Sequence, residues 1–406
     1  MNDQKPMAWL PHSIADAVIS GGGVDVDLFA AWMQLLERLT AAGELVASDP
    51  LKRNEIDYAS GMRHLMVLLA VGVDEALRVD PDPVLSVRRT STDDILTWGM
   101  ECPDCIYFRA TLRSGETYRL YGNRGTARYV GLQTMDGITS TANCLVDDLE
   151  PDTDGNFETI LSADEHEGHW LRLHGEHPAL VVRHFFYDWN TEKPSSLNIE
   201  RIGARVEPMR CTVGPDIAVS RQLCALGEFV HDNLKFFLDF NAAAPANGFL
   251  PPIDRTAIGA AAENRPVIGR FELEADEALI LEVEPPNGLY WSYSLGNQWW
   301  ETIHYGRHQS SLNAHQAHVD PDGVLRVVVA SRDPGVANWL DTAGHSNGAI
   351  ILRCVRTDTA PTPTARVVAY ADIDSALPAD TVRVTAPERT RIIEERRRAV
   401  HDRFVR

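Results

Sequence analysis

Several features that define common classes of protein are missing from this 406-residue chain. It has no run of about 18 apolar residues, and its longest apolar stretch, Leu65 to Val73, is too short to span a bilayer. The first residues lack the basic region and apolar core of a secretory signal. Six cysteines in a chain of this length do not make a disulfide framework. We therefore expect no membrane insertion and a cytoplasmic protein with reduced thiols.

Basic residues are scarce as well. The chain has 38 Lys and Arg against 58 Asp and Glu, which gives a formal net charge of −20. Nucleic acids and anionic membranes need a basic footprint, so neither is expected as a partner. Hydrophobic residues make up 44% of the chain and charged residues 24%, as in ordinary globular proteins. A chain of this length can bury more than one core.

Motifs for cofactors and metals give little support to those chemistries. GxGxxG and Walker patterns are absent, no phosphate loop follows the glycine run at 21–23, and we expect no GxSxG pattern of a nucleophile elbow. Cys102 and Cys105 form a CxxC motif, but a strand pattern follows it instead of a helix, and no second CxxC completes a zinc ribbon. No HExxH motif occurs. We expect no serine-hydrolase site, no organic cofactor and no bound metal, with a metal-dependent enzyme as an outside alternative.

Periodicity predicts an α+β fold. Apolar residues at helical spacing mark four segments, which are Asp25 to Leu39, Asn54 to Ala76, Ile217 to Leu238 and Ala386 to Phe404. Short β-branched and aromatic runs separated by Gly, Asp and Asn fill the blocks 84–210 and 267–369, as in a sandwich or barrel. The Arg and Glu residues of the last helix are expected to form a solvated face. No internal repeat can be aligned, although the two blocks are similar in character.

These patterns predict two strand-rich, β-sandwich or jelly-roll-like domains with helical additions at the amino terminus, in the middle and at the carboxyl terminus. The expected divisions are 1–83 (helical), 84–215 (first sandwich), 216–264 (helical connection and loop), 265–375 (second sandwich) and 376–406 (Arg-rich helix). The sequence Asp80 to Pro83 should stop the second helix. The Asp320 to Gly323 segment should form a hairpin turn between two strands.

Side chains capable of chemistry are concentrated between Tyr290 and Cys354. This stretch holds four Trp, five His and four Asp. His304 and His308 are expected on a strand, and His315 should share a strand face with Asn313. After the strand at 324–331, the Pro-Gly turn and the residues up to His345 form either a polar-pinned structural loop that buries Trp339 or a rigid loop that presents Asp341 and His345 to a pocket.

The functional interpretation assigns a role to each of these residue types. Asp341 would orient or activate, and His345 or His315 would transfer a proton. The remaining side chains would bind substrate, and they are Asn313, Asn338, Trp300, Trp339, Asp104 and Tyr107. The test of this interpretation is whether residues from both blocks converge on one site.

The stretch also resembles a known family. The pattern consists of Trp291, Leu295, Asn297, Trp299, Tyr305, Ser311-Leu312-Asn313, Asp322-Gly323, Asp333-Pro334-Gly335, Asn338-Trp339-Leu340-Asp341 and Gly344. It is similar to the bacterial domain-of-unknown-function family numbered twelve-fourteen, strongly in the carboxyl-terminal half and weakly before it. Residues 103–112 resemble that family's NPDxxY strand entry, with Cys102 in place of Asn. The resemblance implies β-sandwich or jelly-roll-like domains and carries no assigned reaction, cofactor or catalytic set.

We therefore expect a cofactor-independent hydrolase or lyase that uses general acid/base chemistry on a lipophilic or sugar-like small molecule in an aromatic-lined cleft. The alternative is a sugar- or lipid-binding protein without catalysis. A homo-oligomer held by the carboxyl-terminal helix is a third hypothesis.

Overall fold

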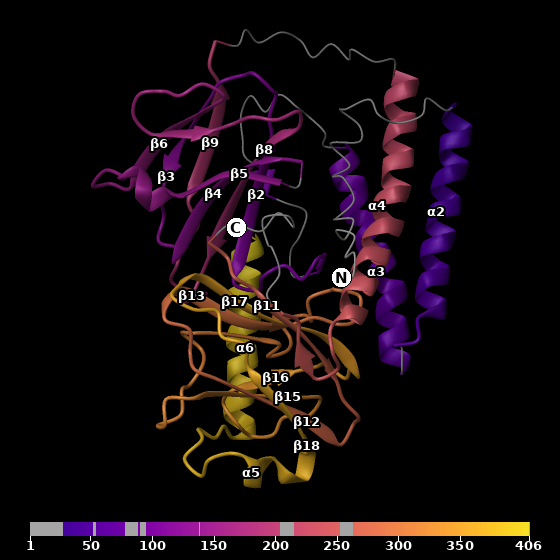
Figure 1. Ribbon diagram of the computed structural model, residues 1–406, viewed down its shortest axis with the longest axis vertical. Helices are drawn as coiled ribbons and strands as arrows, with labels where there is room; N and C mark the ends of the chain where they lie inside the picture. Colours follow the sequence, from indigo (N-terminus) through magenta and orange to yellow (C-terminus); the bar gives the residue numbers. More distant parts are fainter. Residues whose placement is uncertain are drawn as a thin grey trace, which may run out of the picture.

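The computed structural model describes residues 27–51, 54–77, 88–89, 95–137, 139–203, 215–251 and 263–405. Within these ranges two β-sandwiches lie one above the other in Figure 1, and a layer of long helices stands beside them. The predicted α+β class is confirmed. The glycine run at 21–23 and the expected helix stop at 80–83 lie outside the described residues.

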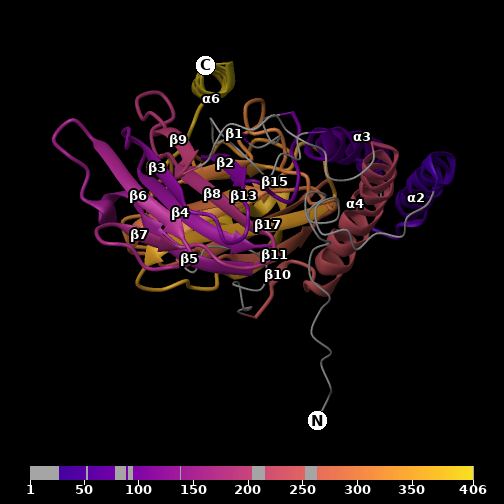
Figure 2. The same ribbon diagram turned by 90° about the horizontal axis from the view of Figure 1, so that it is seen from above.

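Three helices form the layer, and they are α2 (Leu28–Ser48), α3 (Glu55–Leu77) and α4 (Pro215–Ala243). Each confirms a predicted helical segment, and α4 lies between α2 and α3 (Figure 2). The Asp27 side chain caps α2 by accepting hydrogen bonds from the N–H groups of Phe29 and Ala30. Asn54 caps α3 in the same way through the N–H of Asp57, at 2.8 Å.

Among the described residues, α3 is long and apolar enough to cross a membrane when judged by length and composition alone. Core helices of soluble proteins meet the same test, and 39% of the apolar window of α3 is buried inside this protein. Its buried face also carries Asp57 and His64. The expected absence of membrane insertion stays a prediction.

The first sandwich is formed by two sheets with the strand orders β1-β2-β8-β4-β5 and β7-β6-β3-β9. Its strands are β1 (Arg88–Arg89), β2 (Cys105–Thr111), β3 (Tyr118–Asn123), β4 (Tyr129–Asp136), β5 (Thr139–Leu145), β6 (Asn156–Ser162), β7 (Trp170–Arg172), β8 (Pro178–Phe185) and β9 (Ser196–Arg201). Leu120, Leu132 and Leu180 are fully buried between the sheets. The alternating apolar positions of the block therefore face one core.

The second sandwich has the strand orders β10-β11-β17-β13-β14 and β16-β15-β12-β18. Its strands are β10 (Gly248–Phe249), β11 (Val267–Glu272), β12 (Glu277–Val283), β13 (Gly288–Leu295), β14 (Ser311–Asn313), β15 (Leu325–Ala330), β16 (Trp339–Asp341), β17 (Asn347–Thr357) and β18 (Thr364–Ala369). Phe271, Leu281 and Leu352 lie in its core.

The two sandwiches have the same topology. Adding nine to each strand number of the first sandwich gives the strand orders of the second, in both sheets. The match extends to direction, because β6–β7 and β15–β16 are parallel while the other strand pairs described in both sandwiches are antiparallel. A long helix precedes each sandwich, α3 before the first and α4 before the second. The chain therefore contains a structural repeat.

The carboxyl-terminal helix α6 (Ala386–Val405) runs along both sandwiches, after the short helix α5 (Ile373–Ala376) (Figure 1). The expectation of a solvated Arg face is wrong for two of its arginines. Arg389 contacts Asp333 and the carbonyl oxygen of Val336 in the second sandwich and is only 6% exposed. Arg396 is equally buried against Trp189 of the first sandwich. Because α6 lies across the junction, these guanidinium groups find carbonyl and aromatic partners that the sequence does not reveal.

Two local expectations in the chemistry-rich stretch are also wrong. His304 and His308 lie in a turn in which the His308 N–H donates to the His304 carbonyl oxygen, and β14 ends before His315. Asp320 and Gly323 do form a turn, but β14 and β15 on either side belong to different sheets, so it does not connect a hairpin.

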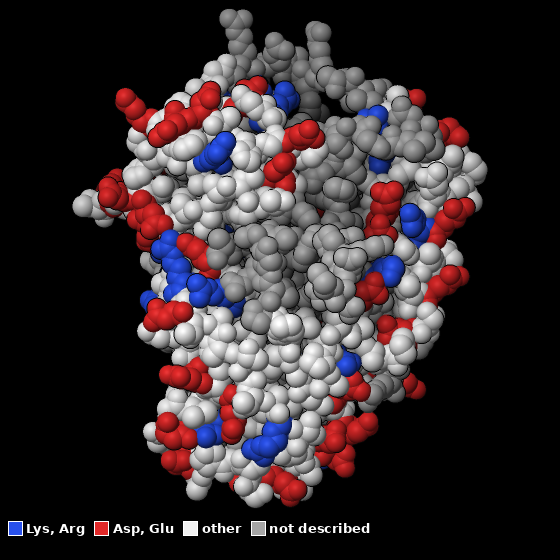
Figure 3. All heavy atoms as spheres, in the orientation of Figure 1, with Lys and Arg blue, Asp and Glu red and all other residues white. Residues whose placement is uncertain are grey.

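Charged side chains are spread over the surface. On the face in Figure 3, acidic side chains lie over both sandwiches and the helices, with basic side chains between them. This distribution agrees with the acidic composition of the chain.

A buried histidine on α3 should make the protein sensitive to acid. His64 is fully buried, and neither ring nitrogen has a hydrogen-bond partner among the described residues. Burial and the nearby Arg63 charge lower the pKa of His64 to about 3. In the unfolded chain this histidine binds a proton near its usual pKa of about 6.5, whereas in the folded protein it stays neutral down to about pH 3. The free energy of unfolding is therefore unaffected above pH 6.5 and decreases as the pH falls from 6.5 toward 3.

We expect His64→Leu to reduce the loss of stability between pH 6 and pH 4 by about 1.4 kcal/mol per pH unit. At pH 7 no hydrogen bond is removed, so stability should be retained or increased. Guanidinium unfolding followed by tryptophan fluorescence at each pH measures both. His166→Leu, at an exposed histidine, is the control. If the free energy of unfolding falls equally steeply with pH in His64→Leu and in wild type, this account is contradicted.

Candidate functional site

The predicted site residues do not converge on one place. They are distributed over a buried junction around Asp104, a polar cluster around His345, and a half-exposed pair that contains Asp341. Each place joins segments that are distant in sequence, so each is described in turn.

Asp104 and Asn313 meet in the junction between the sandwiches. Oδ1 of Asp104 accepts hydrogen bonds from the indole N–H of Trp189 at 2.6 Å and from Nδ2 of Asn313 at 2.9 Å. Its Oδ2 accepts from the Tyr290 hydroxyl, also at 2.6 Å. Asp104, Tyr290 and Asn313 are fully buried. The carboxylate therefore satisfies three buried donors and holds the two sandwiches together.

Other groups around this junction support a structural role. The Tyr107 hydroxyl accepts the N–H of Cys102 at 3.2 Å, and burial raises the pKa of Tyr107 well above its usual value. Burial lowers the pKa of Arg396 to about 10, an effect that the charge of Asp104 opposes. The sequence analysis assigned Asp104 and Asn313 to a substrate-binding set and did not select Trp189 or Tyr290. No local pattern distinguishes those two from core aromatic residues.

A cluster with a hydroxyl, an imidazole and a carboxylate lies where α3 meets the second sandwich. Oδ2 of Asp57 accepts the Ser346 hydroxyl at 2.6 Å, and Oδ1 lies 3.0 Å from Nδ1 of His345. Asp57 is fully buried, His345 is 8% exposed, and Ser346 is half-buried. Asp57 stands in the first turn of α3, where the positive end of the helix dipole favours its ionised form.

The segment 344–348 of the chain reads GHSNG and matches the GxSxG pattern. The expectation that no such pattern exists is therefore wrong. The context differs from a nucleophile elbow, which joins a strand to a helix, because here the serine precedes strand β17. Ala343 and Gly344 both adopt positive φ, 51° and 84°, which produces the sharp turn that directs the following side chains toward α3.

Surrounding contacts hold this cluster in place. The indole N–H of Trp299 donates to the backbone oxygen of Asp57 at 2.9 Å, and Nδ2 of Asn347 donates to Oε1 of Gln298 at 2.7 Å. Glu301 forms an ion pair with Arg63. Burial raises the pKa of Glu301, while the charges of Arg63 and His345 lower it. The cluster is thus a fixed polar layer between helix and sheet.

Asp341 pairs with His308, and it does not face His345. Oδ2 of Asp341 lies 2.8 Å from Nδ1 of His308, and Oδ1 accepts the N–H of Ala343 at 2.8 Å. The His308 side chain is 37% exposed and that of Asp341 is 14% exposed. His315 is separate from this pair, and its N–H donates to Oδ1 of Asn313 at 3.0 Å. His308 belongs to the histidine group noted in the sequence but was not selected from it.

The loop before Asp341 is pinned by polar contacts, as one of the two interpretations predicted. Oδ1 of Asn338 accepts the N–H of His318 at 2.9 Å, and Nδ2 donates to the Arg326 carbonyl oxygen at 2.9 Å. The Trp339 indole is 6% exposed and donates to the Ala330 carbonyl oxygen at 3.0 Å. Both side chains are occupied by the fold itself.

Trp300 is also part of a core. Its ring stacks on Phe237 of α4 at 5.1 Å and meets Phe240 edge-on at 5.0 Å. It is 6% exposed. The expectation that Trp300 lines a cleft does not agree with this position, because α4 covers the ring.

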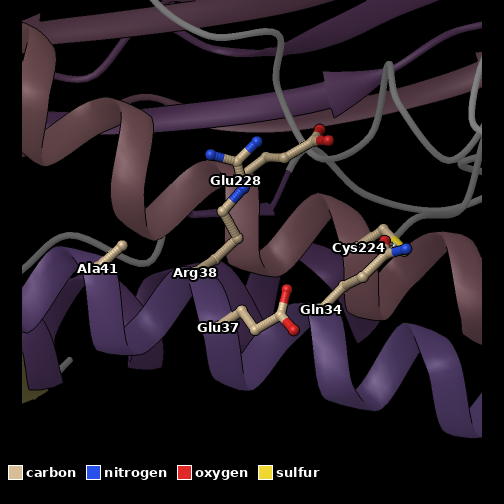
Figure 4. Close-up of a pocket in the computed structure, with 6 residues that line it drawn as sticks. All are labelled: Gln34, Glu37, Arg38, Ala41, Cys224 and Glu228. Atoms are coloured by element: carbon tan, nitrogen blue, oxygen red, sulfur yellow. Dashed lines mark hydrogen bonds between the residues drawn. The ribbon is translucent and has the colours of Figure 1, made fainter.

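A surface cleft of about 490 Å³ lies between α2 and α4 (Figure 4). Six residues line it, and they are Gln34, Glu37, Arg38, Ala41, Cys224 and Glu228. None of the predicted site residues is among them. Within the described ranges, no group of three or more His, Cys, Asp or Glu side chains is placed to hold a metal ion.

These features define a protein of two β-sandwiches with one repeated topology, joined by a helical layer that brings a carboxylate to a Ser-His turn. Residues 271–359 match a family model described as a protein of unknown function, DUF1214. A crystal structure of an uncharacterized protein from Burkholderia cenocepacia is 30% identical and has a TM-score of 0.78, covering 88% of this chain and 99% of that one. The chain belongs to the same family as that protein, and its second sandwich carries the DUF1214 region.

A second solved structure, of a protein from Vibrio parahaemolyticus, is 11% identical with a TM-score of 0.44 and covers 83% of this chain and 100% of that one. No curated protein matches the chain. The resemblance noted from the sequence is confirmed for residues 271–359. The weaker resemblance of the earlier residues stays a prediction.

Proposed function

We propose that the protein is a cofactor-independent hydrolase in which Ser346 is the nucleophile, Asp57 its base and His345 the group that orients the carboxylate. The supporting observation is that Asp57 contacts both side chains, at 2.6 Å and 3.0 Å, from a helix far away in sequence. A nucleophile hydrogen-bonded to a base that a third group holds is the general arrangement of covalent catalysis.

The geometry suggests the following sequence of proton transfers. Ser346 attacks an acyl carbon while Asp57 takes the hydroxyl proton, and Asp57 then returns it to the leaving group. Water next attacks the acyl-enzyme ester with Asp57 again as base, which frees Ser346 and the acid. The imidazole N–H at Nδ1 of His345 fixes the carboxylate throughout. The substrate would be a small lipophilic or sugar-like ester.

A serine-directed fluorophosphonate tests this proposal without knowledge of the substrate. The full chain should gain one phosphonyl group, and peptide mapping should locate it on Ser346. Ser346→Ala should abolish labelling, and Asp57→Asn should slow it by about 100-fold or more, the usual effect of losing a general base. Ser375→Ala, at an exposed serine, should label like wild type. Absence of label on Ser346 in folded wild type would reject the nucleophile assignment.

A second candidate centre is the His308–Asp341 pair, favoured by the exposure of His308. If the N–H at Nδ1 of His308 donates to Asp341, Nε2 of the same ring is free of a proton and can act as a general base. It could then take a proton from a substrate or from bound water, as lyase or hydrolase chemistry requires. Turnover of p-nitrophenyl esters and glycosides should then fall at least 100-fold in His308→Gln and remain in Ser346→Ala. A third outcome is that a ligand binds but is not converted, and that its affinity is the same in both variants and across the pH range. The protein would then be a binding protein instead of an enzyme.

A further inference from the structure

The helices α2 and α3 carry large apolar side chains that face solvent. Of the 17 large hydrophobic side chains that are exposed within the described ranges, 11 stand on these two helices. Ten of the 11 recur at helical intervals, so they form one stripe along each helix. The stripes consist of Leu28, Phe29, Trp32, Met33 and Leu36 on α2, and of Tyr58, Met62, Met66, Val73 and Leu77 on α3.

The two stripes belong to one apolar face of the helical layer. Partly buried leucines border each stripe, Leu39 on α2 and Leu65 and Leu69 on α3, and they pack against the core that α2, α3 and α4 share. A surface helix normally turns polar side chains to solvent, whereas these two helices are apolar on a second side as well. A contiguous exposed apolar face of this kind marks an interaction site.

The size and composition of the face are those of a protein–protein interface. Its ten side chains are between 37% and 74% exposed. Since a large side chain covers about 150–250 Å² when it is buried, their exposed parts amount to about 1,000 Å². An interface of standard size needs about 800 Å² from each partner. Three of the ten residues are aromatic and three are methionine, which are types enriched in interfaces.

Charge favours a protein partner over a membrane surface. The helices α2 and α3 hold one arginine each and no lysine, and the whole chain has a net charge of −20. Helices that lie on membranes carry many Lys and Arg residues on their polar side, which attract anionic lipids. Residues 28–36 contain no charged residue, and Arg63 of α3 is paired with Glu301. The ten apolar side chains therefore present no repelling charge to an identical face.

We propose that this face is the interface of a homodimer, in which α2 and α3 of one chain pack on α2 and α3 of a second copy. A two-fold arrangement places the same patch on both sides of the interface, so the apolar stripes of one copy meet those of the other. Removal of the ten side chains from water drives the association. The acidic surface outside the face stays in solvent, where its charge opposes further association of dimers.

Sedimentation equilibrium of the full chain at micromolar concentration tests the proposal. The mass should be twice the 45.1 kDa of one chain. Phe29→Glu and Met66→Glu should each weaken dimerisation at least 100-fold, because a carboxylate enters an apolar interface. These side chains are 72% and 70% exposed in the single chain, so both variants should fold, as circular dichroism checks. Val319→Glu, at an exposed valine outside the face, should dimerise like wild type.

A second measurement locates the interface without any substitution. Met33, Met62 and Met66 are exposed in the single chain and buried in the proposed dimer. Hydroxyl-radical footprinting should therefore oxidise these three methionines at least threefold more slowly in concentrated protein than in dilute protein. Equal rates at both concentrations in a protein that does dimerise would overturn the assignment of this face.

The remaining outcomes identify other occupants of the face, and each of them overturns the proposal. A wild-type monomer that floats with phosphatidylcholine vesicles would show that the face binds lipid. A wild-type monomer with a carbodiimide cross-link between Lys5 and Glu37 would show that residues 1–26 of the same chain cover it. A dimer that neither Phe29→Glu nor Met66→Glu weakens would have its interface elsewhere.

Discussion

Replacing Asp104 by alanine should lower the free energy of unfolding by about 3–5 kcal/mol, the usual cost of removing one partner from a buried charged network. The change removes the acceptor of the Trp189 indole and one acceptor each of the Tyr290 hydroxyl and the Asn313 amide, which keep the Ser292 hydroxyl and the Tyr187 carbonyl oxygen. Each unsatisfied buried donor costs about 1–3 kcal/mol. Guanidinium unfolding at pH 7 measures the loss.

Two further variants make this prediction specific. Tyr290→Phe removes one donor and leaves the carboxylate with its other two, so we expect a smaller loss, of about 1 kcal/mol. Asp380→Ala, at an exposed aspartate, should change stability by less than about 0.5 kcal/mol. Equal stabilities of Asp104→Ala and Asp380→Ala would show that the junction does not depend on the carboxylate.

Arg396→Met should destabilise the protein by about 3 kcal/mol, because a buried guanidinium with charge-assisted bonds is replaced by an apolar side chain of similar length. Arg396 donates to the carbonyl oxygen of Tyr305 at 3.1 Å and to Oγ of Ser311 at 2.7 Å, and its guanidinium carbon lies 4.6 Å from the Trp189 ring centre. The variant removes the donor to the Tyr305 carbonyl and Ser311 hydroxyl oxygens and removes a positive charge near Asp104.

The neighbouring arginine is a matched control for this test. Arg397 stands on the same helix and is exposed, so Arg397→Met should leave stability within about 0.5 kcal/mol of wild type. Equal unfolding free energies for Arg396→Met and Arg397→Met would contradict the assigned role of α6. Size-exclusion chromatography of both variants shows whether α6 also contributes to an oligomer, which stays a prediction.

Much of the fold could be predicted from local patterns. The helical spacing of apolar residues such as Leu35, Leu65 and Leu226 marked α2, α3 and α4, since neighbours three and four residues apart lie on one face of a helix. Short β-branched segments marked both sandwiches. The repeated topology escaped detection because a sandwich core accepts many apolar residues of suitable size at each position, so two copies can share strand order without alignable sequence.

Contacts between partners that are close in sequence, or that belong to the family pattern, were the easier ones to anticipate. The pinned loop at Asn338 agrees with one of the two interpretations, and Asp104 and Asn313 meet each other but not Asp341 or His345. The partners of Asp341 and His345 were not predictable. Strand β16 ends at Asp341 and the turn at Ala343 and Gly344 reverses the chain, so these two side chains point to different surroundings although they are four residues apart.

The sequence by itself determined the α+β fold class, the positions of the long helices and the strand-rich blocks. It also showed that His, Trp and Asp are concentrated near the DUF1214 region. The tertiary structure decided which of these groups meet. Asp57 reaches Ser346 across 289 residues, and Arg396 of α6 becomes buried beside Trp189. Periodicity depends on contacts within a few residues, whereas these pairings depend on how helices dock on sheets, and no local pattern records that docking.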